Sequence, residues 1–134
     1  MDRYLGYRRA LHHYNILYRE DYLIEDRGED RLFKELALPE DMPTAFVCNN
    51  DEIACILIEK LEKMGYSVPE DISVTGFDNY PFIRRNASGL TTVDVDIAMM
   101  ASEGVELLLE RLNDKRETFV RRVVSGHIAV SYTH

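Results

Sequence analysis

Residues 44–77, TAFVCNNDEIACILIEKLEKMGYSVPEDISVTGF, contain two candidate strands with a candidate helix between them. The run 44–48 is continuously β-prone, as a strand buried on both faces of a sheet would be. Over 51–64 apolar residues recur at helical spacing, and Gly65 follows where a left-handed helix cap belongs. The second strand is 72–77. A strand–helix–strand unit of this kind joins two parallel strands by a right-handed crossover.

The segments on either side of this unit also alternate between helix and strand. We expect helices over 2–14, in a short stretch ending near Leu38 before Pro39, and over 96–112, and strands over 16–23, 90–93 and 121–130. An aspartate is expected to cap the helix that begins near residue 96. Alternation of this kind predicts an α/β protein built on a parallel sheet.

The composition is that of a soluble globular domain of ordinary size. The 134 residues are 46% hydrophobic and 30% charged. The net charge of −8 repels a phosphate backbone, so we expect no contact between this chain and nucleic acid. The chain has neither a run of 18 apolar residues nor the residue order of a signal peptide, which predicts no membrane contact and a cytoplasmic location.

We expect the cysteines and histidines to form neither a redox nor a metal site. Cys48 and Cys55 are seven residues apart across a strand-to-helix turn, which favours two buried, reduced thiols over a disulfide. The spacing typical of zinc ligands is missing among the four histidines, His12, His13, His127 and His134. We therefore predict no metal and no cofactor.

Polar side chains follow both strands of the central unit: Asn49, Asn50 and Asp51 follow the first strand and Asp78 follows the second. In an open parallel sheet, ligands bind beyond the carboxyl ends of neighbouring strands, so these groups are expected to face one crevice. Asn donates and accepts hydrogen bonds while ionised Asp accepts them, a mixture that suits the vicinal hydroxyls of a sugar. Two alternatives stay open: Asn50 or Asp51 caps the following helix, and Asp78 organises the turn.

Aromatic side chains recur before the central unit, at Tyr4, Tyr7, Tyr14, Tyr18 and Tyr22. One of these rings could stack on a bound sugar. The commoner role of such a tyrosine is half-buried packing with a solvated hydroxyl.

An enzyme that uses Asp51 and Asp78 is the alternative from a different class. Acid–base or phosphoryl chemistry needs a matched base, lysine or metal beside the carboxylates. The sequence contains no phosphate-binding loop, no nucleophile elbow and no paired cysteine and histidine. We therefore predict that the chain is not an enzyme.

Four stretches of this chain, in this order, resemble one known family. Residues 3–11 are similar to R-x-x-G-[FY]-x-x-A-L, 43–54 to P-T-A…N-D-x-x-A, 68–79 to V-P-x-D-[IV]-S-V-x-G-[FY]-D-[DN], and 90–93 to L-T-T-[VI]. Together they resemble the effector-sensing domain of LacI/GalR transcription regulators. The resemblance covers residues 3 to about 130.

The resemblance implies an incomplete three-layer, Rossmann-like lobe of the type I periplasmic-binding-protein kind. Residues 1–134 would form a single domain, mainly the C-terminal lobe, with about 90–120 crossing towards an N-terminal lobe that this chain lacks. Several leucines of the second long helix would then lack a partner surface within the chain, namely Leu107, Leu108, Leu109 and Leu112. A partner chain or a domain swap is expected to cover them.

The resemblance also implies roles for individual residues. Arg3, Asn50 and Asp78 would hold a small-molecule effector, a sugar. Ala54, Cys55 and the 80–88 segment would lie at the interface of a homodimer. The implied function is sugar sensing in a LacI/GalR-type regulator, without the DNA-binding headpiece. A periplasmic-type sugar-binding lobe is the nearest alternative, but no export signal is seen and the motifs at Asn50 and 90–92 are typical of regulators.

Overall fold

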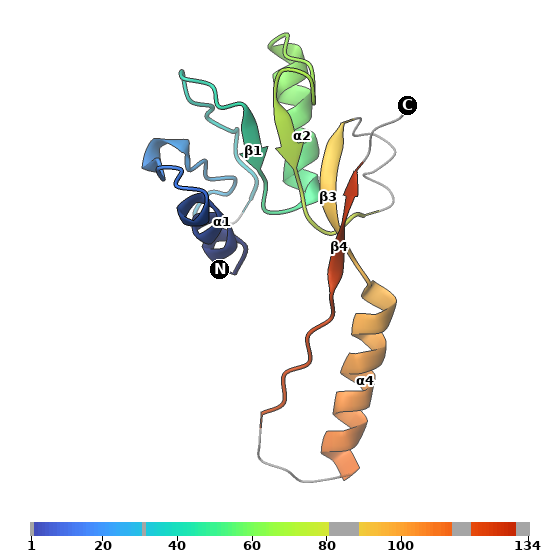
Figure 1. Ribbon diagram of the computed structural model, residues 1–134. Helices are drawn as coiled ribbons and strands as arrows, with labels where there is room; N and C mark the ends of the chain where they lie inside the picture. Colours follow the sequence, from blue (N-terminus) through green and yellow to red (C-terminus); the bar gives the residue numbers. More distant parts are fainter. Residues whose placement is uncertain (1, 31, 81–88, 114–118, 131–134) are drawn as a thin grey trace.

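The computed structural model describes residues 2–30, 32–80, 89–113 and 119–130. Its elements are α1 (Asp2–His13), the 3-10 helix η1 (Glu20–Tyr22), β1 (Ala45–Val47), α2 (Asp51–Lys63), β2 (Ser73–Thr75), β3 (Leu90–Val95), α4 (Ile97–Asn113) and β4 (Gly126–Val130) (Figure 1). The predicted helices over 2–14, 51–64 and 96–112 and the predicted strands over 44–48, 72–77 and 90–93 are all present, with slightly different bounds. The strand expected over 16–23 is replaced by η1, and β4 is shorter than predicted.

The four strands form one sheet in the order β1-β2-β3-β4. β1 pairs parallel with β2, and β2 pairs parallel with β3, so Phe46 lies beside Val74 and Val74 beside Leu90. This confirms the parallel strand–helix–strand unit. The sheet is mixed rather than wholly parallel, because the chain leaves the sheet through α4 and returns antiparallel to β3 as β4.

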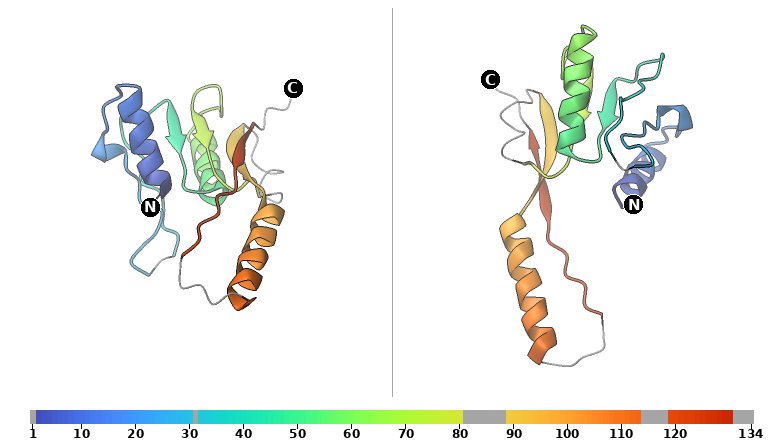
Figure 2. Two further views of the ribbon diagram at one scale, coloured as in Figure 1. Left: turned by 60° about the horizontal axis from the view of Figure 1, so that its bottom comes forward. Right: turned by 180° about the vertical axis from the view of Figure 1, so that it is seen from behind.

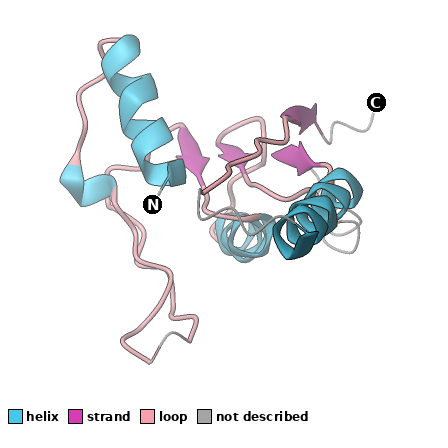
Figure 3. Ribbon diagram, turned by 90° about the horizontal axis from the view of Figure 1, so that it is seen from below, coloured by secondary structure: helices cyan, strands magenta, loops and turns pink. Residues whose placement is uncertain are grey.

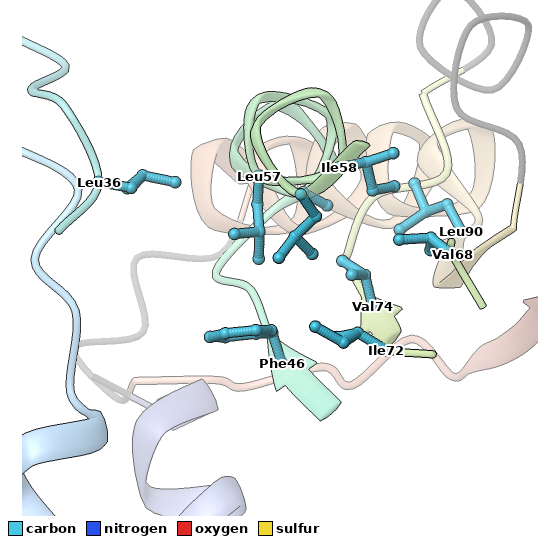
Figure 4. Close-up of a cluster of buried hydrophobic side chains, with 10 residues drawn as sticks. Leu36, Phe46, Leu57, Ile58, Val68, Ile72, Val74 and Leu90 are labelled. Atoms are coloured by element: carbon cyan, nitrogen blue, oxygen red, sulfur yellow. The ribbon is translucent and has the colours of Figure 1, made fainter. Parts of the chain in front are cut away.

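Helix α2 covers one face of this sheet. Its N-cap is Asn50, whose side-chain oxygen accepts a hydrogen bond from the Ile53 amide, and Gly65 has the predicted left-handed φ of 92° after its end. Figure 4 shows α2 above the strands, with most of the core cluster between them. The cluster consists of Leu36, Phe46, Ala54, Leu57, Ile58, Leu61, Val68, Ile72, Val74 and Leu90. Burying each large side chain stabilises the fold by about 1.5–3 kcal/mol.

The opposite face of the sheet is open over β1. Phe46 is buried under α2, but Val47 is 63% exposed and Ala45 is also exposed. The expectation that this strand is buried on both faces is therefore wrong. The physical reason is that α1 lies beyond the β1 edge, and no other described helix packs on the second face, so the expected third layer is not formed there (Figure 3).

Residues 27–40 contain no helix among those described, so the helix predicted to end near Leu38 is wrong. Asp30 accepts a hydrogen bond from the Leu32 amide, and Gly28 donates to the Leu32 carbonyl, which closes a turn. Such local bonds compete with helical ones. Only Leu36 of this segment is fully buried, and it joins the core from the side of α2 (Figure 4).

Helix α4 and residues 119–125 extend away from the sheet as an arm (Figures 1 and 2). Asp96 is the predicted aspartate cap of α4, since its carboxylate accepts a 2.8 Å hydrogen bond from the Met99 amide. Arg122 links the two parts of the arm through ion pairs of 2.6–3.0 Å with Glu103, Glu106 and Glu110.

No residue of α4 is buried. Leu108, Leu109 and Leu112 are exposed and Leu107 is half-buried, so the described residues offer these side chains little partner surface, as expected. No helix in the described ranges is long and apolar enough to cross a membrane.

Candidate functional site

Arg3 lies where the first turn of α1 meets the carboxyl ends of two strands. Its guanidinium donates to the Asn49 carbonyl at 3.0 Å, just after β1, and lies 3.6 Å from the Asp78 carboxylate, after β2. The same guanidinium stacks 3.9 Å from the centre of the Phe77 ring. Three segments distant in sequence therefore converge on one cation, at the edge where ligands bind in parallel sheets.

Asp78 has an unusual backbone conformation. Its φ is 105° and that of Asn79 is 50°, both in the region that residues other than glycine avoid. The Asp78 amide donates to the Val93 carbonyl at 3.0 Å, which holds this turn against β3. Conformations of this kind cost about 1–3 kcal/mol each and cluster at binding sites. The Asp78 side chain is 44% exposed, so its carboxylate is accessible.

Asn50 lies beside this cluster but its side chain is partly engaged. Its Oδ1 accepts the 3.0 Å hydrogen bond from Ile53 that caps α2, which decides which of Asn50 and Asp51 is the cap. Its amide NH₂ bonds to no described residue and can donate to a ligand. The structure thus brings Arg3 and Asp78 into contact and gives Asn50 a structural bond as well.

Asp51, the other cap candidate, has a structural role. Its side chain is buried and accepts hydrogen bonds from the Thr92 hydroxyl at 2.6 Å and the Tyr80 amide at 3.2 Å. Its own amide donates to the Phe77 carbonyl at 3.0 Å. Gly76 passes so close that a Cβ there would collide with the Asp51 carboxylate. Asp51 therefore ties α2 to β3 and is closed to a ligand.

Both cysteines are free thiols, as predicted, but both residues are half-buried rather than buried. Burial raises the pKa of the Cys48 thiol to about 12 and that of the Cys55 thiol to about 11. Both thiols stay protonated at neutral pH, and protonated thiols are poor nucleophiles and poor metal ligands. In the described part of the chain, no three acidic, histidine or cysteine side chains gather as a metal site would need.

The residues expected at a homodimer interface differ in accessibility. Ala54 has no exposed surface and packs in the core, so in this structure it has nothing to present to a second chain. Cys55 is half-buried, and its neighbour Ile56 is 40% exposed. Of the 80–88 segment, all but Tyr80 lies outside the described residues.

A cavity of about 510 Å³ adjoins this site along the free edge of β1. Its walls come from α1, from residues 18–26, from β1 and from α2, and include four of the five tyrosines singled out in the sequence, Tyr4, Tyr7, Tyr18 and Tyr22. Arg3 and Asn49 line it as well, so the cavity and the strand-end cluster share two residues. Asn50 and Asp78 are not among its lining residues.

A family model described as a periplasmic binding protein-like domain matches residues 1–130. The chain belongs to this family. Transcriptional repressors are among its curated relatives, which confirms the resemblance drawn from the four motifs. The arabinose metabolism transcriptional repressor of Geobacillus stearothermophilus is 32% identical over 123 residues, covering 86% of this chain and 34% of that protein.

A second relative and a solved structure agree with this assignment. The HTH-type transcriptional repressor PurR of Mannheimia succiniciproducens is 37% identical over 124 residues, covering 87% of this chain and 37% of the repressor. The chain thus spans little more than a third of the length of these repressors. The complex of the transcriptional regulator CelR with cellobiose shares the fold, with a TM-score of 0.76 over 96% of this chain and 41% of that chain at 24% identity.

Sequence reasoning gave no individual role to two residues of this cluster, Phe77 and Thr92. Phe77 stacks on the Arg3 guanidinium, and the Thr92 hydroxyl donates a hydrogen bond to the buried Asp51 carboxylate. Both residues lie within the motifs 68–79 and 90–93, but a motif does not say what a side chain contacts. The partner of Thr92 is 41 residues away in the sequence. Asn49 was expected at this strand end, and it is the backbone carbonyl of Asn49 that accepts the 3.0 Å hydrogen bond from Arg3.

Proposed function

We propose that the chain senses a small-molecule effector, a sugar, as one lobe of a LacI/GalR-type transcription regulator, and that it catalyses no reaction. The observation that carries this is the placement of Arg3 against Asn49 and Asp78 at the carboxyl ends of β1 and β2. The relatives named as repressors, and the regulator solved with cellobiose, support it.

The Arg3–Asp78 pair has the properties of a ligand-binding pair rather than of a structural ion pair. The charges are 3.6 Å apart and the two side chains are 46% and 44% exposed. An exposed pair of this kind contributes only about 0–1 kcal/mol, so a ligand can separate it at little cost. A sugar hydroxyl placed between them accepts from Arg3 and donates to Asp78, and each charge-assisted bond is worth about 1.5–3 kcal/mol.

Enzymatic use of the two aspartates is disfavoured, because both carboxylate oxygens of Asp51 accept hydrogen bonds, from the Thr92 hydroxyl and the Tyr80 amide.

We assign DNA binding and switching to the parts of a longer regulator that this chain does not span. A change in the orientation of two lobes needs both lobes. We also propose a cytoplasmic location and a homodimer, with Cys55 and Ile56 as the accessible residues at the start of α2.

The test is a calorimetric and NMR titration of this chain with glucose, arabinose and cellobiose. We expect binding in the millimolar range, since one lobe supplies only part of a two-lobed cleft, and loss of that binding in Asp78→Asn. Glu70→Gln is the matched control, because it removes an exposed carboxylate with no bond to the described residues. Nanomolar binding, or wild-type affinity in Asp78→Asn, would contradict the proposal.

A further inference from the structure

Arg3 is positioned by its own contacts rather than by the packing of its helix. None of the described α1 side chains, residues 3–13, is fully buried. The Arg3 guanidinium nevertheless has three partners, which are the Asn49 carbonyl, the Asp78 carboxylate and the Phe77 ring. The differences among these contacts decide which of them persists when an effector binds.

Two of the three contacts use polar groups that a ligand also needs. Arg3 donates to the Asn49 carbonyl through one terminal nitrogen, and its other terminal nitrogen lies 3.6 Å from a carboxylate oxygen of Asp78. A ligand hydroxyl that binds between Arg3 and Asp78 separates this ion pair. The ion pair therefore does not hold Arg3 in place once the ligand is bound.

The stacking contact with Phe77 uses no N–H group. The guanidinium carbon of Arg3 lies over the Phe77 ring, 3.9 Å from its centre. The N–H donors of an arginine lie in the plane of the guanidinium and point outward from its edge, while its flat face stacks on aromatic rings. Stacking thus fixes the Arg3 guanidinium and leaves its N–H donors available to the Asn49 carbonyl and to a ligand.

The backbone of Phe77 is held on both sides. Its carbonyl accepts a 3.0 Å hydrogen bond from the Asp51 amide at the start of α2. The amides of its neighbours Gly76 and Asp78 donate to carbonyls of β3 at 2.8 and 3.0 Å. The side chain is half-buried. The ring is therefore a platform that is already in place before a ligand binds.

We propose that Phe77 is a positioning residue of the sensing site, and that its ring holds the Arg3 guanidinium in its binding orientation whether or not Asp78 is paired with it. This rests on the proposed function, because it concerns the same site. An arginine side chain has many rotamers to lose on binding, and a side chain that is ordered beforehand binds more tightly.

The inference distinguishes the aromatic ring of Phe77 from its apolar bulk. Leucine at position 77 keeps an apolar side chain but lacks the negative ring face that attracts a cation. Tyrosine keeps that ring face. Phe77→Leu should therefore release the Arg3 guanidinium, and Phe77→Tyr should hold it as phenylalanine does.

The first measurement is NMR of the chain without ligand. Protons close to the face of an aromatic ring resonate upfield, so the δ protons of Arg3 should lie upfield of their position in urea. This upfield shift should persist in Asp78→Asn and Phe77→Tyr and disappear in Phe77→Leu. Loss of the shift in Asp78→Asn would show that the ion pair positions Arg3, and would overturn the inference.

The second measurement is a titration with cellobiose, followed by NMR. Phe77→Leu should weaken binding about two- to fivefold, which corresponds to the strength of an exposed cation–π contact. Phe77→Tyr should bind cellobiose as the wild type does. Because tyrosine restores the ring face and leucine does not, a role in packing alone would not produce this pattern.

Phe33 provides the matched control. Its ring lies 4.2 Å from the guanidinium carbon of Arg27, in a pair of residues outside the cluster at the strand ends. Phe33→Leu removes a similar stacking contact and should change neither the Arg3 proton shifts nor the affinity for cellobiose. Equal weakening by Phe33→Leu and Phe77→Leu would overturn the inference, because the loss would then not depend on Arg3.

The outcomes separate this inference from the proposed function. Wild-type affinity for cellobiose in Phe77→Leu, together with loss of binding in Asp78→Asn, overturns the role of Phe77 and leaves the sensing function standing. If glucose, arabinose and cellobiose shift no amide of the wild type, both proposals are wrong.

Discussion

At the scale of single residues, the buried Asp51 carboxylate determines which residue types its neighbours can be. A buried carboxylate is tolerated only when hydrogen bonds replace its water. Thr92 and the Tyr80 amide supply two such bonds. Gly76 leaves the space for them, because any side chain there would collide with the carboxylate.

The first prediction concerns this close approach. Gly76→Ala should lower the free energy of unfolding by about 1–3 kcal/mol, the usual cost of overpacking a core. Gly6→Ala is the control: a Cβ at Gly6, on the exposed side of α1, meets no atom within 4 Å, and it should stabilise the chain by about 0.5–1 kcal/mol. Urea unfolding followed by circular dichroism measures both. Equal effects of the two substitutions would contradict the close contact.

The second prediction concerns thiol chemistry. Because the pKa values of Cys48 and Cys55 are raised to about 12 and about 11, their thiolate fractions stay small until the pH approaches those values. At pH 8 we expect both to react with a disulfide reagent far more slowly in the folded chain than in urea, with Cys48 the slower. Each of the variants Cys48→Ser and Cys55→Ser leaves a single thiol, so its reaction rate belongs to the remaining cysteine. If a cysteine reacts as fast in the folded chain as in urea, its pKa is not raised by folding.

At the scale of elements, α2 and α4 have similar local signals and different surroundings. Both are capped by a polar side chain, Asn50 for α2 and Asp96 for α4. Helix α2 buries its apolar side against the sheet, whereas no residue of α4 is buried. The segment before β4 stays beside α4 through Arg122, which reaches carboxylates on successive turns of the helix.

The third prediction tests this link within the arm. Arg122→Gln should increase the fast backbone motion of residues 119–125 at low salt, seen as lower 15N–1H heteronuclear NOE values, because three ion pairs are lost together. Exposed pairs contribute about 0–1 kcal/mol each and are screened by salt, so the difference should shrink as ionic strength rises. Arg121→Gln, at an exposed neighbour, is the control. Unchanged NOE values in Arg122→Gln would show that the ion pairs do not hold the segment.

At the scale of the whole molecule, the arm exposes apolar side chains that a chain of this size normally covers. Leu108 is 65% exposed and Leu112 79%, and Phe119 in the same arm is 94% exposed. Apolar patches larger than a few hundred Å² are seldom left in water. We therefore expect a second chain or a swapped arm to cover this surface in solution.

The fourth prediction is that self-association depends on the arm. Light scattering at micromolar concentrations should show association in the wild type and a shift to monomer in Leu108→Glu, without loss of stability, since the side chain is exposed. Ile56→Glu tests the interface implied at the start of α2 instead. If the wild type is monomeric at all concentrations, self-association occurs neither through the arm nor through the start of α2.

The parts of the fold predicted correctly from sequence are those that depend on neighbouring residues. The helix over 51–64, its end at Gly65 and the parallel pairing around it follow from apolar spacing, capping and the rule for crossovers. The motif holding Asp78 was likewise visible, because its residues are contiguous. The helix near Leu38 was wrong because turn bonds at Asp30 outcompete a weak helical preference.

By itself, the sequence determined the α/β class, the strand–helix–strand unit and the family. It did not determine that Asn50 caps and Asp51 is buried, that Arg3 contacts Asp78 75 residues away, or that an edge cavity gathers four tyrosines. Only the tertiary structure decided these, because each depends on distant segments meeting in space. Spacing along a chain specifies local conformation, while the environment of a polar group is set by which other segments cover it.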